Sequence, residues 1–209
     1  MQQNYPAILL GALAFWLSWA IPAHASGFSL FHSREEQSGD LSSFPKWTGM
    51  VDRMSRTHGA RCGDGSCSPH SWEETMATLP HEPLGTGLLK HINDRFNKAE
   101  YILDIKNWGV TDYWATPLQF LIKNGDCEDY AIAKYMALKT LGWPVDDMRV
   151  VVLQDRNLNV LHSVLAVKDG GSTYILDNQI HSLVTDREIH HYQPIYSINE
   201  HAWWRHLPN

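Results

Sequence analysis

The sequence predicts an α+β fold in which N-terminal helices pack on an antiparallel sheet. Apolar residues recur at helical spacing through most of the chain before Gly142. From Arg149 onward, apolar and polar residues alternate in short segments that are separated by turns. Helices followed by a run of strands are typical of the α+β class.

Composition and charge limit the classes of function. The 209 residues are 44% hydrophobic and 19% charged, which suits one globular domain with its own core. The net charge of -6 argues against nucleic acid as a partner. No apolar run of about 18 residues follows the N-terminal segment, so we expect no internal membrane span.

The N-terminal segment has the features of a secretory signal peptide. Residues 7–21 are apolar apart from Ser18, and Ala23-His24-Ala25 fits a small-x-small cleavage site. We therefore expect a signal peptide over 1–25, a mobile lead-in over 26–43 and a single domain over 44–209. The first six residues contain no Lys or Arg, so an uncleaved membrane anchor is the alternative.

Export implies an oxidising compartment, in which disulfides persist. Cys62 and Cys67 could close a small loop as a disulfide, which would leave Cys127 as an odd thiol. A zinc site formed by this pair with His58 and His70 is the alternative. Its spacing matches no standard zinc finger, so we favour the disulfide.

Apolar stripes predict three helices in the first half of the chain, over residues 44–55, 71–79 and 85–101. Residues 104–114 are rich in aromatic side chains and are expected to be irregular. Thr116-Pro117 begins a fourth helix, because Thr is a good N-cap and Pro suits the first helical position.

One cysteine and three carboxylates lie together in the segment Asn124-Gly125-Asp126-Cys127-Glu128-Asp129-Tyr130. Asn-Gly predicts a turn and Asp126 is a good N-cap, so Cys127 becomes the first residue of a helix that runs to about Leu141. The helix amino end favours a thiolate, whereas the flanking carboxylates disfavour a second negative charge. A bound cation, or a histidine from another segment, would resolve this conflict.

The segments after this helix supply a histidine and an aspartate on neighbouring strands. We expect strands over residues 149–153, 160–167 and 172–177. If Asp169-Gly170 forms a type I′ turn, as we expect, His162 lies directly opposite Asp177, within reach of a hydrogen bond. If Gly170-Gly171 is the turn instead, the two residues are diagonal neighbours on the same face.

Cys127, His162 and Asp177 thus form a set with the roles of nucleophile, base and orienter. Histidine would take the thiol proton, and aspartate would fix the tautomer and stabilise the imidazolium. Each residue alone more often has a structural role, as a buried thiol, a satisfied core histidine or a strand-end cap. The three together, in this order and topology, favour catalysis.

The chain after Gln179 is hydrophilic and contains five histidines, which are His181, His190, His191, His201 and His206. These could form a metal cluster. We favour a solvated tail that packs on the body of the protein through Trp203 and Trp204.

Several stretches between residues 85 and 178 carry a family pattern. The most specific is Asp126-Cys127-Glu128-Asp129-Tyr130-Ala131-Ile132-Ala133-Lys134-Tyr135. The others are Trp108-Gly109, Asp112-Tyr113-Trp114-Ala115-Thr116-Pro117, His162-Ser163-Val164-Leu165 and Leu176-Asp177-Asn178. With these stretches, the sequence resembles the bacterial transglutaminase-like cysteine proteinases, the periplasmic proteases of LapG type. The resemblance implies a papain/transglutaminase-like core with Cys127 as nucleophile, His162 as base and Asp177 as orienter.

The resemblance also implies a calcium requirement, with Asp126, Glu128 and, less directly, Asp129 as ligands. Calcium takes oxygen ligands and would offset the negative charge beside the thiolate. The implied substrate is a large surface adhesin, cleaved in its N-terminal region at a di-alanine site to release cells from a biofilm. The implied partner is an inner-membrane receptor that responds to cyclic-di-GMP and sequesters the protease in the periplasm.

Three other functions fit the same residues. A transglutaminase or a cell-wall peptide amidase would use the same Cys-His-Asp triad with another acceptor or substrate. A calcium-binding adaptor with an inactive triad would belong to a different class. Thiol reactivity distinguishes the adaptor from the enzymes, because a structural cysteine is inert.

Overall fold

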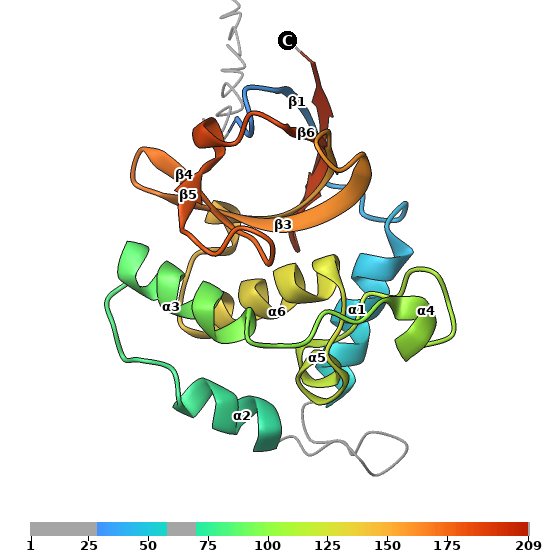
Figure 1. Cartoon of the computed structure of the whole chain (residues 1–209), viewed down its shortest axis with the longest axis vertical. Helices are drawn as coiled ribbons and strands as arrows, with labels where there is room; N and C mark the ends of the chain where they lie inside the picture. The colour runs from blue at the N-terminus through green and yellow to red at the C-terminus, as the bar shows by residue number, and fades with distance from the viewer. Residues whose placement is uncertain (1–28, 58–69, 209) are drawn as a thin grey trace, which may run out of the picture.

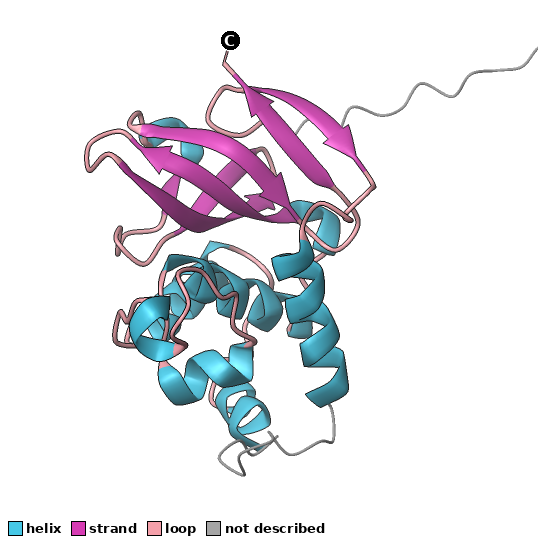
Figure 2. Ribbon diagram, turned by 90° about the vertical axis from the view of Figure 1, so that its right-hand side faces the viewer, coloured by secondary structure: helices cyan, strands magenta, loops and turns pink. Residues whose placement is uncertain are grey.

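The computed structural model describes residues 29–57 and 70–208. One seven-stranded antiparallel sheet lies on one side of the molecule, and the helices gather against one of its faces (Figures 1 and 2). The predicted α+β class, with helices packed on an antiparallel sheet, is confirmed. The expected signal peptide over 1–25, together with His58, Cys62 and Cys67, lies outside the described residues.

The helices follow the chain in the order α1 (Pro45–Thr57), α2 (His70–Ala77), α3 (Thr86–Phe96), α4 (Asp104–Asn107), α5 (Pro117–Lys123) and α6 (Cys127–Thr140), with the short 3-10 helices η1 (Val145–Asp147) and η2 (Asp186–Glu188). The helix expected over 85–101 ends earlier, at Phe96, and the one-turn helix α4 occupies part of the segment expected to be irregular. None of the helices within the described ranges is long and apolar enough to span a membrane.

The strands are β1 (Arg34–Ser38), β2 (Met148–Asp155), β3 (Val160–Asp169), β4 (Ser172–Leu176), β5 (Val184–Thr185), β6 (Tyr192–Ile198) and β7 (Trp203–Leu207). Their order in the sheet is β1-β7-β6-β2-β3-β4-β5. The sheet is strongly curved, and its concave side faces away from the helices in Figure 1.

Helix α6 is the central helix of the fold. It lies directly beneath the sheet, with α3 and α5 beside it (Figure 1), and its residues from Glu128 to Leu138 are all buried. Small side chains at Ala131, Ala133 and Ala137 let the backbone approach its neighbours closely. Because α6 is buried on all sides, its first residue is held in a fixed position relative to the sheet.

Local sequence signals explain where α5 begins. The Thr116 hydroxyl accepts a hydrogen bond from the Gln119 backbone, and the Gln119 side chain accepts one from the Thr116 backbone, which completes a capping box. Pro117 occupies the first turn. The predicted start of this helix at Thr116-Pro117 is confirmed.

The β3–β4 register follows the second of the two turns considered. Asp169 pairs with Ser172 and Leu165 with Leu176, so Gly170-Gly171 is the two-residue turn. Gly170 has φ +58°, a left-handed conformation that glycine adopts without strain. The expected turn at Asp169-Gly170 is therefore wrong.

The segment expected to be a mobile lead-in contains a strand. Residues 34–38 form β1, which pairs with β7 along its whole length. Glu35 of this strand forms an ion pair with buried Arg149 of β2 at 2.8 Å, and Leu30 is fully buried in the core on the outer face of the sheet. The sequence pattern misses this strand because only two of its five side chains are even partly covered.

The tail expected after Gln179 is also part of the sheet. β6 lies between β7 and β2, and Trp204 of β7 is buried, so the C-terminal segment contributes to the core. His206 is buried too, with Ser33 at 2.7 Å on Nδ1 and Ser197 at 2.9 Å on Nε2. Buried polar side chains in this segment find hydrogen-bond partners inside the protein, and a hydropathy pattern cannot reveal such partners.

Candidate active site

Cys127 is the first residue of α6, as predicted from the Asn-Gly turn. Asn124 adopts φ +60° to make the turn, and Asp126 has the extended backbone of an N-cap residue. The Asp126 side chain does not cap the helix, and its Oδ2 instead accepts a hydrogen bond from the Asp104 backbone at 3.3 Å. The carboxylate next to the cysteine is thereby available for another role.

The Cys127 thiol lies in a negative environment. Its S–H donates to Glu128 Oε2 at 3.4 Å. Burial raises the pKa of the thiol well above its usual value, and the charges of Glu128 and Asp126 raise it further. A backbone hydrogen bond from Ser163, the residue after His162 on β3, acts in the opposite direction. The electrostatic conflict expected from the sequence is therefore present in the structure.

His162 and Asp177 form a buried hydrogen-bonded pair. His162 Nε2 lies 2.9 Å from Asp177 Oδ1, and the two side chains are 1% and 0% exposed. An ionised carboxylate only accepts hydrogen bonds, so Nε2 carries the proton and Nδ1 keeps a free electron pair. The imidazole therefore presents Nδ1 as its basic atom, with the Gln179 amide at 3.4 Å from it.

The Asp177 carboxylate is held ionised by three donors. Besides His162, Oδ1 accepts from the Gln179 backbone at 2.8 Å, and Oδ2 accepts from the Tyr192 hydroxyl at 2.7 Å. Burial raises the pKa of Asp177, but these hydrogen bonds outweigh burial and leave the pKa below its ordinary value. Tyr192 of β6 was not foreseen, because the sequence pattern placed it in a tail.

The structure brings β3 against the start of α6, since the Ser163 backbone reaches the Cys127 thiol. Within residues 29–57 and 70–208, however, the thiol proton is directed to Glu128, and no hydrogen bond joins Cys127 to His162. Two tryptophans precede the cysteine, and Trp114 packs against Trp47 in the core. Trp108 has a buried Nε1 that lacks a partner among the described residues.

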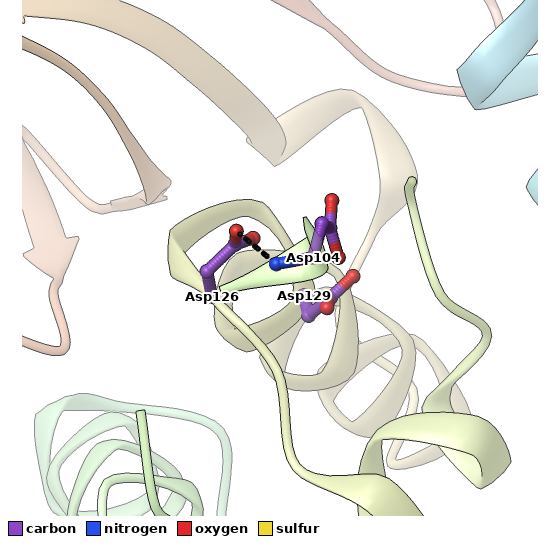
Figure 3. Close-up of side chains that lie close together, drawn as sticks. All are labelled: Asp104, Asp126 and Asp129. Atoms are coloured by element: carbon purple, nitrogen blue, oxygen red, sulfur yellow. Dashed lines mark hydrogen bonds between the residues drawn. The ribbon is translucent and has the colours of Figure 1, made fainter. Parts of the chain in front are cut away.

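Three carboxylates converge around the start of α6: Asp104, Asp126 and Asp129 (Figure 3). All three are buried, and one oxygen from each lies within 4.8 Å of the others. In the described part of the chain, Asp104 Oδ1, Asp126 Oδ1 and Asp129 Oδ2 have no hydrogen-bond partner. Three orphaned buried carboxylate oxygens are the donor set that a hard cation such as calcium binds.

Burial, together with the proximity of the carboxylates to one another, raises the pKa of two of them. Burial raises the pKa of Asp129 to about 8 and that of Asp104 to about 6, and the charge of Asp126 contributes to both shifts. Backbone amides hold the remaining oxygens, since Ala115 donates to Asp129 at 2.7 Å and Tyr113 donates to Asp104. The cluster is thus fixed in place by the backbone while its free oxygens repel one another.

The cluster differs in one member from the set expected from the sequence. Asp126 and Asp129 are in it, whereas Glu128 belongs to an overlapping group with Asp104 and Asp112. Asp104, which the two groups share, was missed because it lies in the aromatic-rich segment far from the cysteine in sequence. Its position directly after Leu103, at the start of a one-turn helix, offers no signal that it meets Asp126.

The family model of the bacterial transglutaminase-like cysteine proteinases matches residues 58–208, which is more than half of the chain. The chain belongs to this family. A search of curated proteins gives no match.

Solved structures of LapG from Legionella pneumophila resemble this member of the family. One is 27% identical with a TM-score of 0.58, and the match covers 74% of this chain and 87% of LapG. A calcium-bound LapG structure is 26% identical with a TM-score of 0.58, covering 74% and 85% of the two chains. An EGTA-treated LapG structure is 27% identical with a TM-score of 0.58, covering 74% and 84%. The resemblance inferred from the cysteine and histidine stretches is confirmed at the level of family and fold.

Proposed function

We propose that this family member is a calcium-dependent cysteine endopeptidase that uses Cys127, His162 and Asp177 as its catalytic triad. The observation that carries the proposal is the buried His162–Asp177 pair, which leaves Nδ1 as a base on a strand that contacts the cysteine helix. Membership of a cysteine proteinase family supports the same roles.

The chemistry is amide hydrolysis through a thioester. Cys127 Sγ attacks the carbonyl carbon of the scissile peptide bond as its proton passes to His162 Nδ1. The imidazolium returns that proton to the leaving amine, the C–N bond breaks, and the acyl group remains on sulfur. A water molecule then loses a proton to His162 and hydrolyses the thioester, which releases the carboxylic acid and the thiol. Backbone N–H groups at the start of α6, with the Trp108 indole, stabilise the oxyanion in each step.

Asp104, Asp126 and Asp129 are the residues that would hold the calcium ion, through their three free oxygens. When bound, the ion supplies positive charge beside Cys127, which favours the thiolate. Glu128 stays a predicted ligand, in the overlapping group with Asp104 and Asp112. The similarity to a calcium-bound LapG supports a calcium site in this chain.

We further propose that the substrate is a large surface adhesin, cut in its N-terminal region at a di-alanine site, and that cleavage promotes biofilm dispersal. The proposed compartment is the periplasm, which the signal-like segment over 1–25 supports. The proposed regulator is an inner-membrane receptor that responds to cyclic-di-GMP and sequesters the protease. These three statements depend on the resemblance to LapG-type proteases.

The test is cleavage of a soluble N-terminal adhesin fragment with calcium and with excess EGTA. We expect one cut within a di-alanine pair in calcium, no cut in EGTA, and no cut by Cys127→Ala at any calcium concentration. Thermal unfolding of Cys127→Ala should match that of the unsubstituted protein, which separates loss of the nucleophile from loss of the fold. Cleavage by Cys127→Ala would rule out the thioester route, and full activity in EGTA would rule out the calcium requirement.

The same assay distinguishes the alternative functions. Hydrolysis adds the mass of water to the products, whereas a transglutaminase would attach an added amine to the acyl fragment. A non-catalytic adaptor would leave the fragment intact, and its Cys127 would not react with iodoacetamide near neutral pH.

A further inference from the structure

Helix α6 contains a buried charged side chain that the proposed mechanism leaves unused. Lys134 is fully buried, and its Nζ donates to Asn93 Oδ1 of α3 at 2.7 Å. It lies two helical turns after Cys127, so both side chains point from the same side of α6. A lysine on an apolar face this close to the nucleophile requires an explanation.

Burying an ammonium group is costly unless another charge compensates it. Asn93 is neutral and cannot supply that compensation. Asp177, the proposed orienter, is fully buried as well, and its negative charge acts on Lys134. The neighbouring titratable group on its own helix is Tyr130, whose ring lies 5.8 Å from Nζ. Lys134 and Asp177 are therefore two buried charges of opposite sign that stabilise each other.

Helix α3 and its C-cap residue, Asn97, hold both members of this pair in position. Asn93 binds the Lys134 ammonium, and Asn97, one turn later, donates through Nδ2 to the Asp177 carbonyl oxygen at 2.7 Å. The carboxylate of Asp177 receives its hydrogen bonds from His162, Gln179 and Tyr192. Lys134 acts on the Asp177 carboxylate from the helix layer, whereas the three hydrogen-bond donors belong to the sheet and its connecting segments.

Burial and the charge of Asp177 act on the Lys134 ammonium in opposite directions. Burial lowers the pKa of Lys134 to about 7, and the negative charge of Asp177 opposes that shift. The ammonium form is therefore present below about pH 7 and is lost as the pH rises further.

We propose that Lys134 is a positioning residue for the His162–Asp177 pair: its ammonium, held by Asn93, stabilises the Asp177 carboxylate and opposes protonation of His162. The proposal rests on the triad roles proposed above. Lys134 touches no substrate and acts only through Asp177 and His162. The negative charge of Asp177 makes the His162 imidazole a stronger base, and the ammonium of Lys134 offsets part of that effect.

The test measures the pKa of His162 by NMR of the 15N-labelled imidazole, so it needs no substrate. All variants carry Cys127→Ala, which removes coupling to the thiol. Lys134→Met removes the charge but leaves Asn93 unpaired, so the main variant is Lys134→Met combined with Asn93→Leu. Replacing both partners with apolar side chains of similar size avoids leaving a buried polar group unsatisfied. Lys139→Met is the matched control, because Lys139 lies on the same helix in an exposed ion pair with Glu200.

We expect the His162 pKa to rise by on the order of half a pH unit or more in the double variant, and to stay unchanged in Lys139→Met. A folded double variant with an unchanged His162 pKa would overturn the proposal. If the double variant does not fold, the reciprocal measurement decides. Titration of the Lys134 Cε signal should move to lower pH when Asp177 is replaced with Asn, and an unchanged Lys134 titration would overturn the proposal.

The acid limb of the pH dependence of kcat/KM gives a separate readout. With Cys127 present, the double variant should shift this limb to higher pH by a similar amount. Absence of all cleavage by the unsubstituted protein would refute the proposed protease function, whereas the NMR result would still report on Lys134.

Discussion

Gly125 and Asp129 lie so close together that a Cβ atom at position 125 would overlap the Asp129 carboxylate. The Asn-Gly turn before the cysteine therefore has a second purpose besides starting α6. It leaves room for Asp129 to reach Asp104 and Asp126 with a free oxygen. The glycine belongs to the candidate cation site although it provides no ligand.

Replacing Gly125 with Ala should weaken calcium binding by at least about tenfold, because the methyl group displaces the Asp129 carboxylate and a misplaced ligand costs on the order of 1.4 kcal/mol or more. Isothermal titration calorimetry of the variant measures this. Gly171→Ala is the matched control, since a Cβ there meets nothing within 4 Å. Unchanged calcium affinity in Gly125→Ala would show that the Asp129 oxygen is not a ligand.

Asp104→Asn should lower calcium affinity as strongly as Asp129→Asn does, because both remove a charged oxygen from the same cluster. Asp94→Asn provides the control, as Asp94 lies in an exposed ion pair with Lys90 on α3. Calorimetry of Glu128→Gln in the same series decides between the two ligand sets. If Glu128→Gln abolishes binding and Asp104→Asn does not, the set expected from the sequence is the right one.

Asp177→Asn should reduce kcat by about 10²- to 10⁴-fold with little change in the fold, because an amide can donate to Nε2 and favour the wrong imidazole tautomer. Tyr192→Phe removes one hydrogen bond from Asp177 and should reduce kcat by roughly tenfold or less. Steady-state kinetics on an adhesin fragment measures both. Equal activity of Asp177→Asn and the unsubstituted protein would exclude Asp177 as the orienter.

The Asp129 carboxyl should lower the stability of the metal-free protein as the pH rises from about 4 to about 8. The pKa of Asp129 in the folded state is about 8, well above its ordinary value of 3.8, so the folded protein holds a proton that the unfolded chain has already released. Urea unfolding in EGTA measures the free energy of unfolding across this range. The side chain of Asp129→Asn cannot titrate, so this variant should lack the pH-dependent contribution of Asp129. The difference in free energy of unfolding between the two proteins therefore isolates that contribution. Saturating calcium should remove the pH dependence of that difference, because the ion stabilises the carboxylate form.

Glu35→Ala should destabilise the protein by about 3 kcal/mol, because it breaks the ion pair at 2.8 Å between Glu35 and buried Arg149. Glu36→Ala, on the same strand, removes an exposed pair with Arg205 and should change the unfolding midpoint little. Chemical denaturation of both variants measures the difference. Equal midpoints would mean that β1 adds no stability through Glu35.

Much of the site could be predicted from sequence because its signals are local. The Asn124-Gly125 turn and the position of Asp126 predict a helix that begins at Cys127, and the helix does begin there. Alternation along β3 and β4 predicts that His162 and Asp177 share a face. That conclusion holds although the preferred turn was wrong, because a shift of two positions keeps side chains on the same face.

Other parts could not be predicted because they depend on contacts between distant segments. β1 has an exposed, polar pattern and exists as a strand because β7 pairs with it. Asp104 joins the acidic cluster because its backbone binds Asp126, 22 positions later in the chain. Neither interaction produces a periodic pattern or a composition bias in the sequence from which it could be predicted.

The sequence by itself determined the α+β class, the helix start at Cys127 and the shared face of His162 and Asp177, since each depends on local periodicity, turn chemistry or strand alternation. It also determined the family, through the motif stretches that contain the cysteine, the histidine and the aspartate. Only the tertiary structure decided the outer strands of the sheet, the place of Asp104 in the cation site and the burial of Lys134 near Asp177. Burial and charge proximity arise from packing between segments far apart in the chain, so they take their values only once the chain is folded.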